Sequence, residues 1–195
     1  MNPLAEGIIA TARAVGADPV DLATVFSYET GGTFDPMQRG PSTQWGEHRG
    51  LIQFGEPQAQ QYGVDWANPL ASQLGANGAV ANYLRSNGFR PGMGLLDLYS
   101  TVNAGAPGRY GASDAGNGGA PGTVADKVNE QMAAHRRNAE NLLAGYISQV
   151  NQLPAQPTES PPVNTLAPPQ YQAPMIDARA FMTAPINVLG GTYGA

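Results

Sequence analysis

Apolar residues recur every three or four positions through most of the first 150 residues. This spacing is typical of helices that bury one face. Helices are predicted over residues 3–15, 18–29, 57–62, 68–86, 95–102 and 123–150, many with capping residues, first-turn prolines or terminal glycines. The segments between them are predicted as a polar loop over 33–47, a short strand or tight loop over 49–54, and a glycine-rich loop over 104–122. The pattern therefore predicts a mainly α-helical domain with little or no sheet.

The helix predicted over residues 18–29 carries a carboxylate on its apolar side. Asp18 is a candidate N-cap, and Gly31 is suited to a left-handed exit after the last turn. Glu29 lies three or four residues after Val25 and Phe26 and so shares their face. Burial and the negative end of the helix dipole both disfavour a charged carboxylate, so we expect a raised pKa for Glu29. Such a pKa suits a general acid near neutral pH, whereas the alternative is a surface residue at a frayed helix end.

Short motifs follow one another along the chain from Glu29 onward. They are Glu29-Thr30, Pro36, Gly50-Leu51-Ile52-Gln53 and Asn103-Ala104-Gly105. In this order and spacing they resemble the lysozyme-like superfamily, most closely the phage-type relatives of the soluble lytic transglycosylases. The resemblance covers roughly residues 1–148. It implies a lysozyme-like helical fold and an enzyme that cleaves the β-1,4 bond between N-acetylmuramic acid and N-acetylglucosamine in the peptidoglycan glycan strand.

The resemblance also implies roles for the acidic residues. Glu29 would protonate the leaving oxygen and, in a lytic transglycosylase, would then act as the base that closes an anhydro-sugar. A lysozyme-type muramidase uses a second carboxylate, for which Glu47 and Asp35 are the candidates.

Two departures from the family pattern leave the reaction class open between these enzymes. Charged residues at 47–49 stand where the family prefers small ones, and Val102 stands where it has a tyrosine. Tyr99 or Tyr110 is a candidate for the missing hydroxyl.

Substrate contacts are predicted from amide and aromatic side chains. Gln53 either contacts the substrate or braces the loop beside Glu29, and Asn103 belongs to the last motif of the resemblance. Trp45, in the polar loop, is a candidate for stacking on a sugar face. Tyr110 is the corresponding candidate in the glycine-rich loop, together with Asn117, unless that loop is only a disordered connector.

Charge and composition narrow the function classes. The net charge of −5 and the pI near 4.8 argue against nucleic-acid binding, which usually requires a basic patch. The chain has no cysteine, and its two histidines are far apart, so neither a metal site nor a cofactor is expected. No export signal or membrane-spanning stretch is recognisable in the sequence, so we expect release through a lysis pore or packaging into a virus particle.

Residues 149–195 differ in composition from the domain predicted over residues 1–148. Eight prolines and only three charged residues occur there, a composition typical of extended backbone. Apolar anchors around Ile176, Phe181 and Val188 suit attachment to a surface, either of this domain or of another subunit, and we favour another subunit.

These features together predict an enzyme in a phage virion, in the tail or ejection apparatus. It would open the host cell wall during genome entry, with residues 149–195 attached to other virion or tail subunits. The alternatives are an inactive lysozyme-like structural or glycan-binding virion protein and a free muramidase endolysin.

Overall fold

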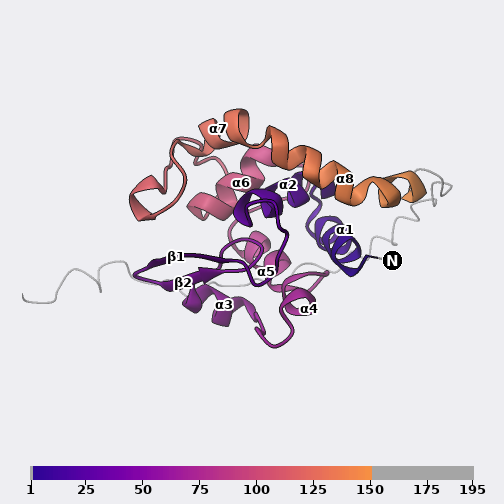
Figure 1. Ribbon diagram of the computed structural model, residues 1–195, viewed down its shortest axis with the longest axis horizontal. Helices are drawn as coiled ribbons and strands as arrows, with labels where there is room; N and C mark the ends of the chain where they lie inside the picture. Colours follow the sequence, from indigo (N-terminus) through magenta and orange to yellow (C-terminus); the bar gives the residue numbers. More distant parts are fainter. Residues whose placement is uncertain (1, 151–195) are drawn as a thin grey trace, which may run out of the picture. The chain divides into compact units, whose positions relative to one another are not determined.

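Helices are the main elements of the computed structural model, which describes residues 2–150 and their side chains as far as residue 146 (Figure 1). The helices are α1 (Pro3–Val15), α2 (Pro19–Glu29), α3 (Glu56–Tyr62), α4 (Pro69–Gln73), α5 (Ala79–Ser86), α6 (Leu95–Ala104), α7 (Val124–Asp126) and α8 (Ala133–Val150). Two strands, β1 (Arg39–Thr43) and β2 (Gly46–Arg49), form a hairpin, and two short segments are a 3₁₀ turn, η1 (Ala115–Asn117), and a π-helical stretch, η2 (Lys127–Gln131). The predicted mainly α-helical class is thus confirmed.

The predicted ends of α2 are also confirmed. The Asp18 side chain accepts a hydrogen bond from the backbone N–H of Val20 at 2.7 Å, as an N-cap does. After the helix, Gly31 and Gly32 have φ values of 61° and 90°, which glycine adopts without strain. Glu29 is therefore the last residue of a helix that is capped at its start and turned sharply at its end.

The prediction of a polar loop over residues 33–47 is wrong, because β1 and β2 lie largely within it. The two strands are antiparallel, with Arg39 opposite Arg49 and Ser42 opposite Glu47. Their side chains are mostly polar and exposed or half-buried, so no alternation of apolar residues marks them. Backbone pairing holds this hairpin rather than burial of one face.

Two predicted helices are interrupted. Residues 68–86 form α4 and α5 with a break at Gly75, whose φ is 98°. The helix predicted over 123–150 is divided by η2 and by Met132. Gly75 and Gly78 mark the first break in the sequence, where they are weak points or close-packing sites, and the structure shows a break there. The apolar spacing continues through η2, so periodicity alone does not reveal the second break.

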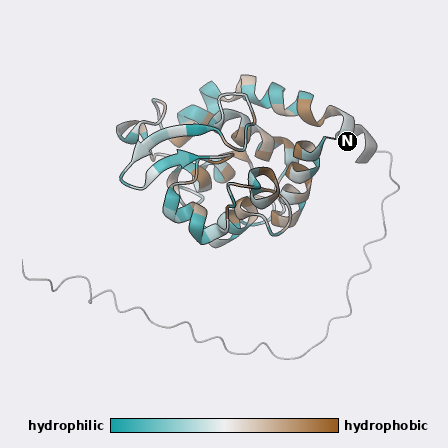
Figure 2. Ribbon diagram, turned by 60° about the horizontal axis from the view of Figure 1, so that its bottom comes forward, coloured by the Kyte–Doolittle hydropathy of each residue, from teal (hydrophilic) through white to brown (hydrophobic). Residues whose placement is uncertain are grey.

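The hydrophobic core lies around α2, which packs against α8, α1 and α6. Fully buried members include Ile8, Leu22, Phe26, Leu84, Leu98 and Leu143. Figure 2 shows hydrophobic residues gathered between the helices and hydrophilic residues along the hairpin and the outer helix faces. Because α2 is surrounded by helices, its last turn is held on the edge of the core. No helix among residues 2–150 is long and apolar enough to cross a membrane.

The attachment tail predicted over residues 149–195 lies outside the described residues, apart from its first two positions at the end of α8.

Candidate active site

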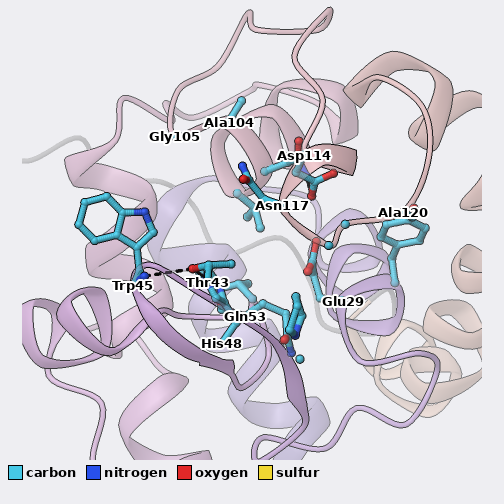
Figure 3. Close-up of a pocket in the computed structure, with 18 of the residues that line it drawn as sticks. Glu29, Thr43, Trp45, His48, Gln53, Ala104, Gly105, Asp114, Asn117 and Ala120 are labelled. Atoms are coloured by element: carbon cyan, nitrogen blue, oxygen red, sulfur yellow. Dashed lines mark hydrogen bonds between the residues drawn. The ribbon is translucent and has the colours of Figure 1, made fainter. Parts of the chain in front are cut away.

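A pocket of about 1060 Å³ lies at the C-terminal end of α2 (Figure 3). The hairpin, the end of α6, the glycine-rich loop and η2 supply its walls. Four of the predicted site residues line it together: Glu29, Trp45, Gln53 and Asn103. Asn117, from the glycine-rich loop, lines it as well. The fold therefore brings residues from three distant parts of the sequence to one cavity.

Glu29 is half-buried in the wall of this pocket. Figure 3 shows its carboxylate directed toward the loop that carries Asp114 and Asn117. Burial, and then the charge of Asp114, raise the pKa of Glu29 from 4.5 to about 7, while Lys127 acts in the opposite direction. Within the described residues, no hydrogen bond or ion pair engages the Glu29 carboxylate. The predicted rise in its pKa is confirmed, and its proton is available to a ligand.

Thr30 fixes the backbone immediately after Glu29. Its buried hydroxyl donates to the carbonyl of Phe26 at 2.7 Å and accepts from the N–H of Phe34 at 2.9 Å. Phe34 has a φ of 55°, which is unusual for a residue other than glycine. The hydroxyl thus ties the last turn of α2 to the segment that leads to the hairpin, which orients Glu29.

Gln53 lies on the hairpin side of the pocket and braces two backbone segments. Its Nε2 donates to the carbonyls of Gly50 at 2.9 Å and Gln38 at 3.3 Å. Its buried Oε1 has no hydrogen-bond partner among the described residues and lies against Gly40, where an added Cβ would be only 1.9 Å away. These contacts support the bracing role, and the substrate contact stays a prediction.

Asn103 lies on the opposite wall, at the end of α6. Its Nδ2 donates to Asp114 Oδ2 at 2.6 Å and to the Tyr99 hydroxyl at 3.3 Å, while its Oδ1 is buried and unpaired. Tyr99 is buried and lines the pocket, whereas Tyr110 is absent from its lining and donates its hydroxyl to Asp97 at 2.6 Å. Of the two tyrosines considered for the missing hydroxyl, the fold brings Tyr99 to Glu29.

The two predicted second carboxylates do not line the pocket. Glu47 forms ion pairs with Arg39 and Arg49, each at 2.8 Å, and the hydrogen bonds from Arg49 and Arg39 hold its pKa below the usual range. Asp35 accepts from the N–H of Met37 at 2.8 Å and shapes the loop before the hairpin. Both acids are engaged in local structure.

Asp114 and Lys127 line the pocket and were not predicted. Lys127 has 1% of its side chain exposed and forms an ion pair with Asp114. No pattern in the sequence marks this pair, because Asp114 lies in a loop without periodicity and lysine is rarely buried. The sequence offers one signal for the pair, which is an acidic residue within the glycine-rich loop.

Trp45 and the tip of the glycine-rich loop border the pocket on two sides. Trp45 is 57% exposed, and its backbone N–H donates to the Thr43 hydroxyl at 3.1 Å. The backbone of Gly118 comes so close to the hairpin that an added Cβ would lie 3.0 Å from Pro41 Cβ. An exposed aromatic ring, several amides and one unpaired carboxyl group thus surround a volume large enough for several sugar rings. Such a surface can hold a polar, ring-shaped ligand and supply a proton to it.

His48 also lines the pocket, on the hairpin side, where it hydrogen-bonds to neighbouring protein groups. Its Nδ1 donates to the Gln53 carbonyl at 2.9 Å, so its Nε2 accepts from the Thr43 hydroxyl at 2.9 Å. The described residues contain no cluster of three side chains that could hold a metal ion.

Comparison of the chain with protein-family models, with curated proteins and with solved structures finds no match.

Proposed function

We propose that this protein is a peptidoglycan glycosidase of the lysozyme-like type, with Glu29 as its general acid. One observation carries the proposal: a carboxyl group with a pKa of about 7, which has no partner among the described residues, lies in the wall of a 1060 Å³ pocket. Near neutral pH a substantial fraction of Glu29 is protonated, which a donor to a glycosidic oxygen requires. The order of the short motifs in the sequence supports the same assignment.

The lytic transglycosylase reaction is the form of this activity that we favour. After protonating the leaving oxygen, Glu29 would be a carboxylate and could accept the proton of the sugar hydroxyl that closes the anhydro ring. Asp114 is the other carboxylate on the pocket wall among the described residues, and its two oxygens are taken by Lys127 and Asn103. A two-carboxylate muramidase would therefore use a carboxylate that Lys127 and Asn103 already hold.

Analysis of the products tests both the activity and its form. Purified cell-wall sacculi are incubated with the protein, and the released fragments are identified by mass spectrometry. Fragments ending in 1,6-anhydro-muramic acid are the expected result. Reducing-end muramic acid, together with loss of activity in Glu47→Gln, would show a muramidase. Binding to sacculi without any fragments would show the inactive or glycan-binding alternative.

We also propose that the enzyme acts as part of a phage virion, in the host cell wall during genome entry. The proposal rests on the resemblance to phage-type enzymes and on the proline-rich composition of residues 149–195. Extended, proline-rich segments lose little entropy when they attach to a surface, so this composition suits a subunit contact.

A further inference from the structure

Lys127 is buried in the short π-helical stretch η2, which is an unusual place for a lysine. Only 1% of its side chain is exposed, although lysine is among the residues least often buried. A buried ammonium group requires a paired charge or hydrogen bonds in compensation. Asp114 supplies that charge through an ion pair.

Asp114 links three elements around the pocket through its two oxygens. Oδ1 pairs with Lys127 of η2, and Oδ2 accepts a hydrogen bond of 2.6 Å from Asn103 at the end of α6. Asp114 itself belongs to the glycine-rich loop. All three residues line the same pocket as Glu29, and Figure 3 shows Asp114 on the side toward which the Glu29 carboxylate is directed.

We propose that Asp114 and Lys127 are a positioning pair for the general acid. They fasten the glycine-rich loop to η2 and balance opposite charges beside Glu29. The inference rests on the proposed function and deepens it, because it assigns the pair to the same reaction without placing either residue in contact with the reacting atoms.

The two charges act on Glu29 in opposite directions. The charge of Asp114 raises the pKa of Glu29, and the charge of Lys127 lowers it. With both residues present these two effects oppose each other, and burial is the main cause of the raised pKa. The other titratable groups that face this part of the pocket are the phenols of Tyr28, Tyr83 and Tyr99, with His48 and Arg39 from the hairpin and His135 packed on Tyr28 from α8. The pKa values of the three phenols are raised, so these groups are neutral near pH 7.

Single substitutions in the pair therefore have effects of opposite sign. Lys127→Met leaves the charge of Asp114 uncompensated and raises the pKa of Glu29 by about one unit, the effect of a close like charge. Asp114→Asn removes the raising charge and lowers this pKa by a similar amount. Lys127→Arg keeps the positive charge and leaves the pKa near its wild-type value. A pair that acted on Glu29 only by holding the loop in place would lower its pKa in both variants, because a loosened loop exposes the carboxyl group to water.

The experiment is an NMR titration of the full chain carrying ¹³C-labelled glutamate, with the Glu29 resonance assigned by comparison with Glu29→Gln. The pH profile of sacculus digestion is recorded for the same variants. We expect its alkaline limb to move to higher pH in Lys127→Met and to lower pH in Asp114→Asn. Should Lys127→Met fail to fold, Asp114→Asn carries the test, because 33% of the Asp114 side chain is exposed and the amide is of similar size.

The outcomes separate this inference from the proposed function. Opposite shifts of the Glu29 pKa in a protein that releases no fragments would support the effect of Asp114 and Lys127 on Glu29 and refute the glycosidase activity. If the protein digests sacculi but the Glu29 pKa is unchanged in both variants, or shifts in the same direction in both, the positioning role of Asp114 and Lys127 is wrong.

Discussion

The folded protein is more stable when the Glu29 carboxyl group is protonated. Its pKa is about 7 in the fold and 4.5 without the fold's influence, so the native state holds this proton more tightly than the unfolded chain does. Its contribution to stability is complete below about pH 4.5 and is lost as the pH rises through 7. The loss is on the order of 3 kcal/mol, since each pKa unit corresponds to about 1.4 kcal/mol.

Replacement of Glu29 by glutamine removes this loss of stability at high pH, because glutamine cannot ionise. We expect Glu29→Gln to melt at a higher temperature than the wild type at pH 8, with the difference shrinking toward pH 4. Thermal unfolding followed by circular dichroism at several pH values measures it. A difference in melting temperature that is constant with pH would argue against a half-buried Glu29 with a raised pKa.

The sequence predicts the position and the raised pKa of Glu29 but not the charged residues beside it. Glu29 is tied to Val25 and Phe26 by helical spacing, so its face follows from local geometry. Asp114 and Lys127 meet through the path of the glycine-rich loop, and no local pattern encodes that path. Glu47 looks like a site residue from its place in the motif, but nearby arginines in the hairpin neutralise it.

The hairpin depends on a glycine that leaves room for the Gln53 amide. An added Cβ at Gly40 would lie 1.9 Å from Gln53 Oε1, whereas one at Gly111 would meet no atom within 4 Å. We expect Gly40→Ala to displace the Gln53 amide, weaken its two backbone hydrogen bonds and destabilise the protein by roughly 1–3 kcal/mol. Gly111→Ala is the matched control, with an expected change within about 0.5 kcal/mol.

Urea unfolding curves and digestion rates of the two alanine variants provide the measurement. Gly40→Ala should show both lower stability and slower digestion, since the hairpin forms one wall of the pocket. Equal stability of the two variants would mean that Gln53 does not brace the hairpin in solution.

Elements were predicted well where local signals agree and poorly where tertiary contacts decide. The ends of α1 and α2 follow from caps, a first-turn proline and glycine exits. The hairpin was missed because β1, with the sequence RGPST, has no apolar alternation and its partner strand supplies its hydrogen bonds. The break at η2 was missed because the apolar spacing continues on both sides of it.

At the scale of the whole molecule, the proposal divides the chain into a catalytic domain and an attachment segment. We expect a chain truncated after Gln149 to digest purified sacculi at close to the full-length rate but to be absent from assembled phage particles. Digestion assays and immunoblots of purified particles measure the two properties. Incorporation of the truncated chain at the full-length level would exclude attachment through residues 149–195.

The predicted helical class and the meeting of Glu29, Gln53 and Asn103 at one pocket are present in the structure, while the lysozyme-like resemblance stays a prediction. The identity of the substrate follows from neither the spacing of apolar residues nor the fold class, since one fold supports many activities.

Digestion of sacculi by wild type, Glu29→Gln and Glu140→Gln tests whether Glu29 is the general acid. Glu140 is an exposed glutamate on α8, so its replacement is a matched control. We predict that the initial rate of fragment release at pH 6 falls by at least ~100-fold in Glu29→Gln, the usual contribution of a general acid, and stays within about twofold in Glu140→Gln. A Glu29→Gln variant that is folded and releases fragments at the wild-type rate would contradict the account.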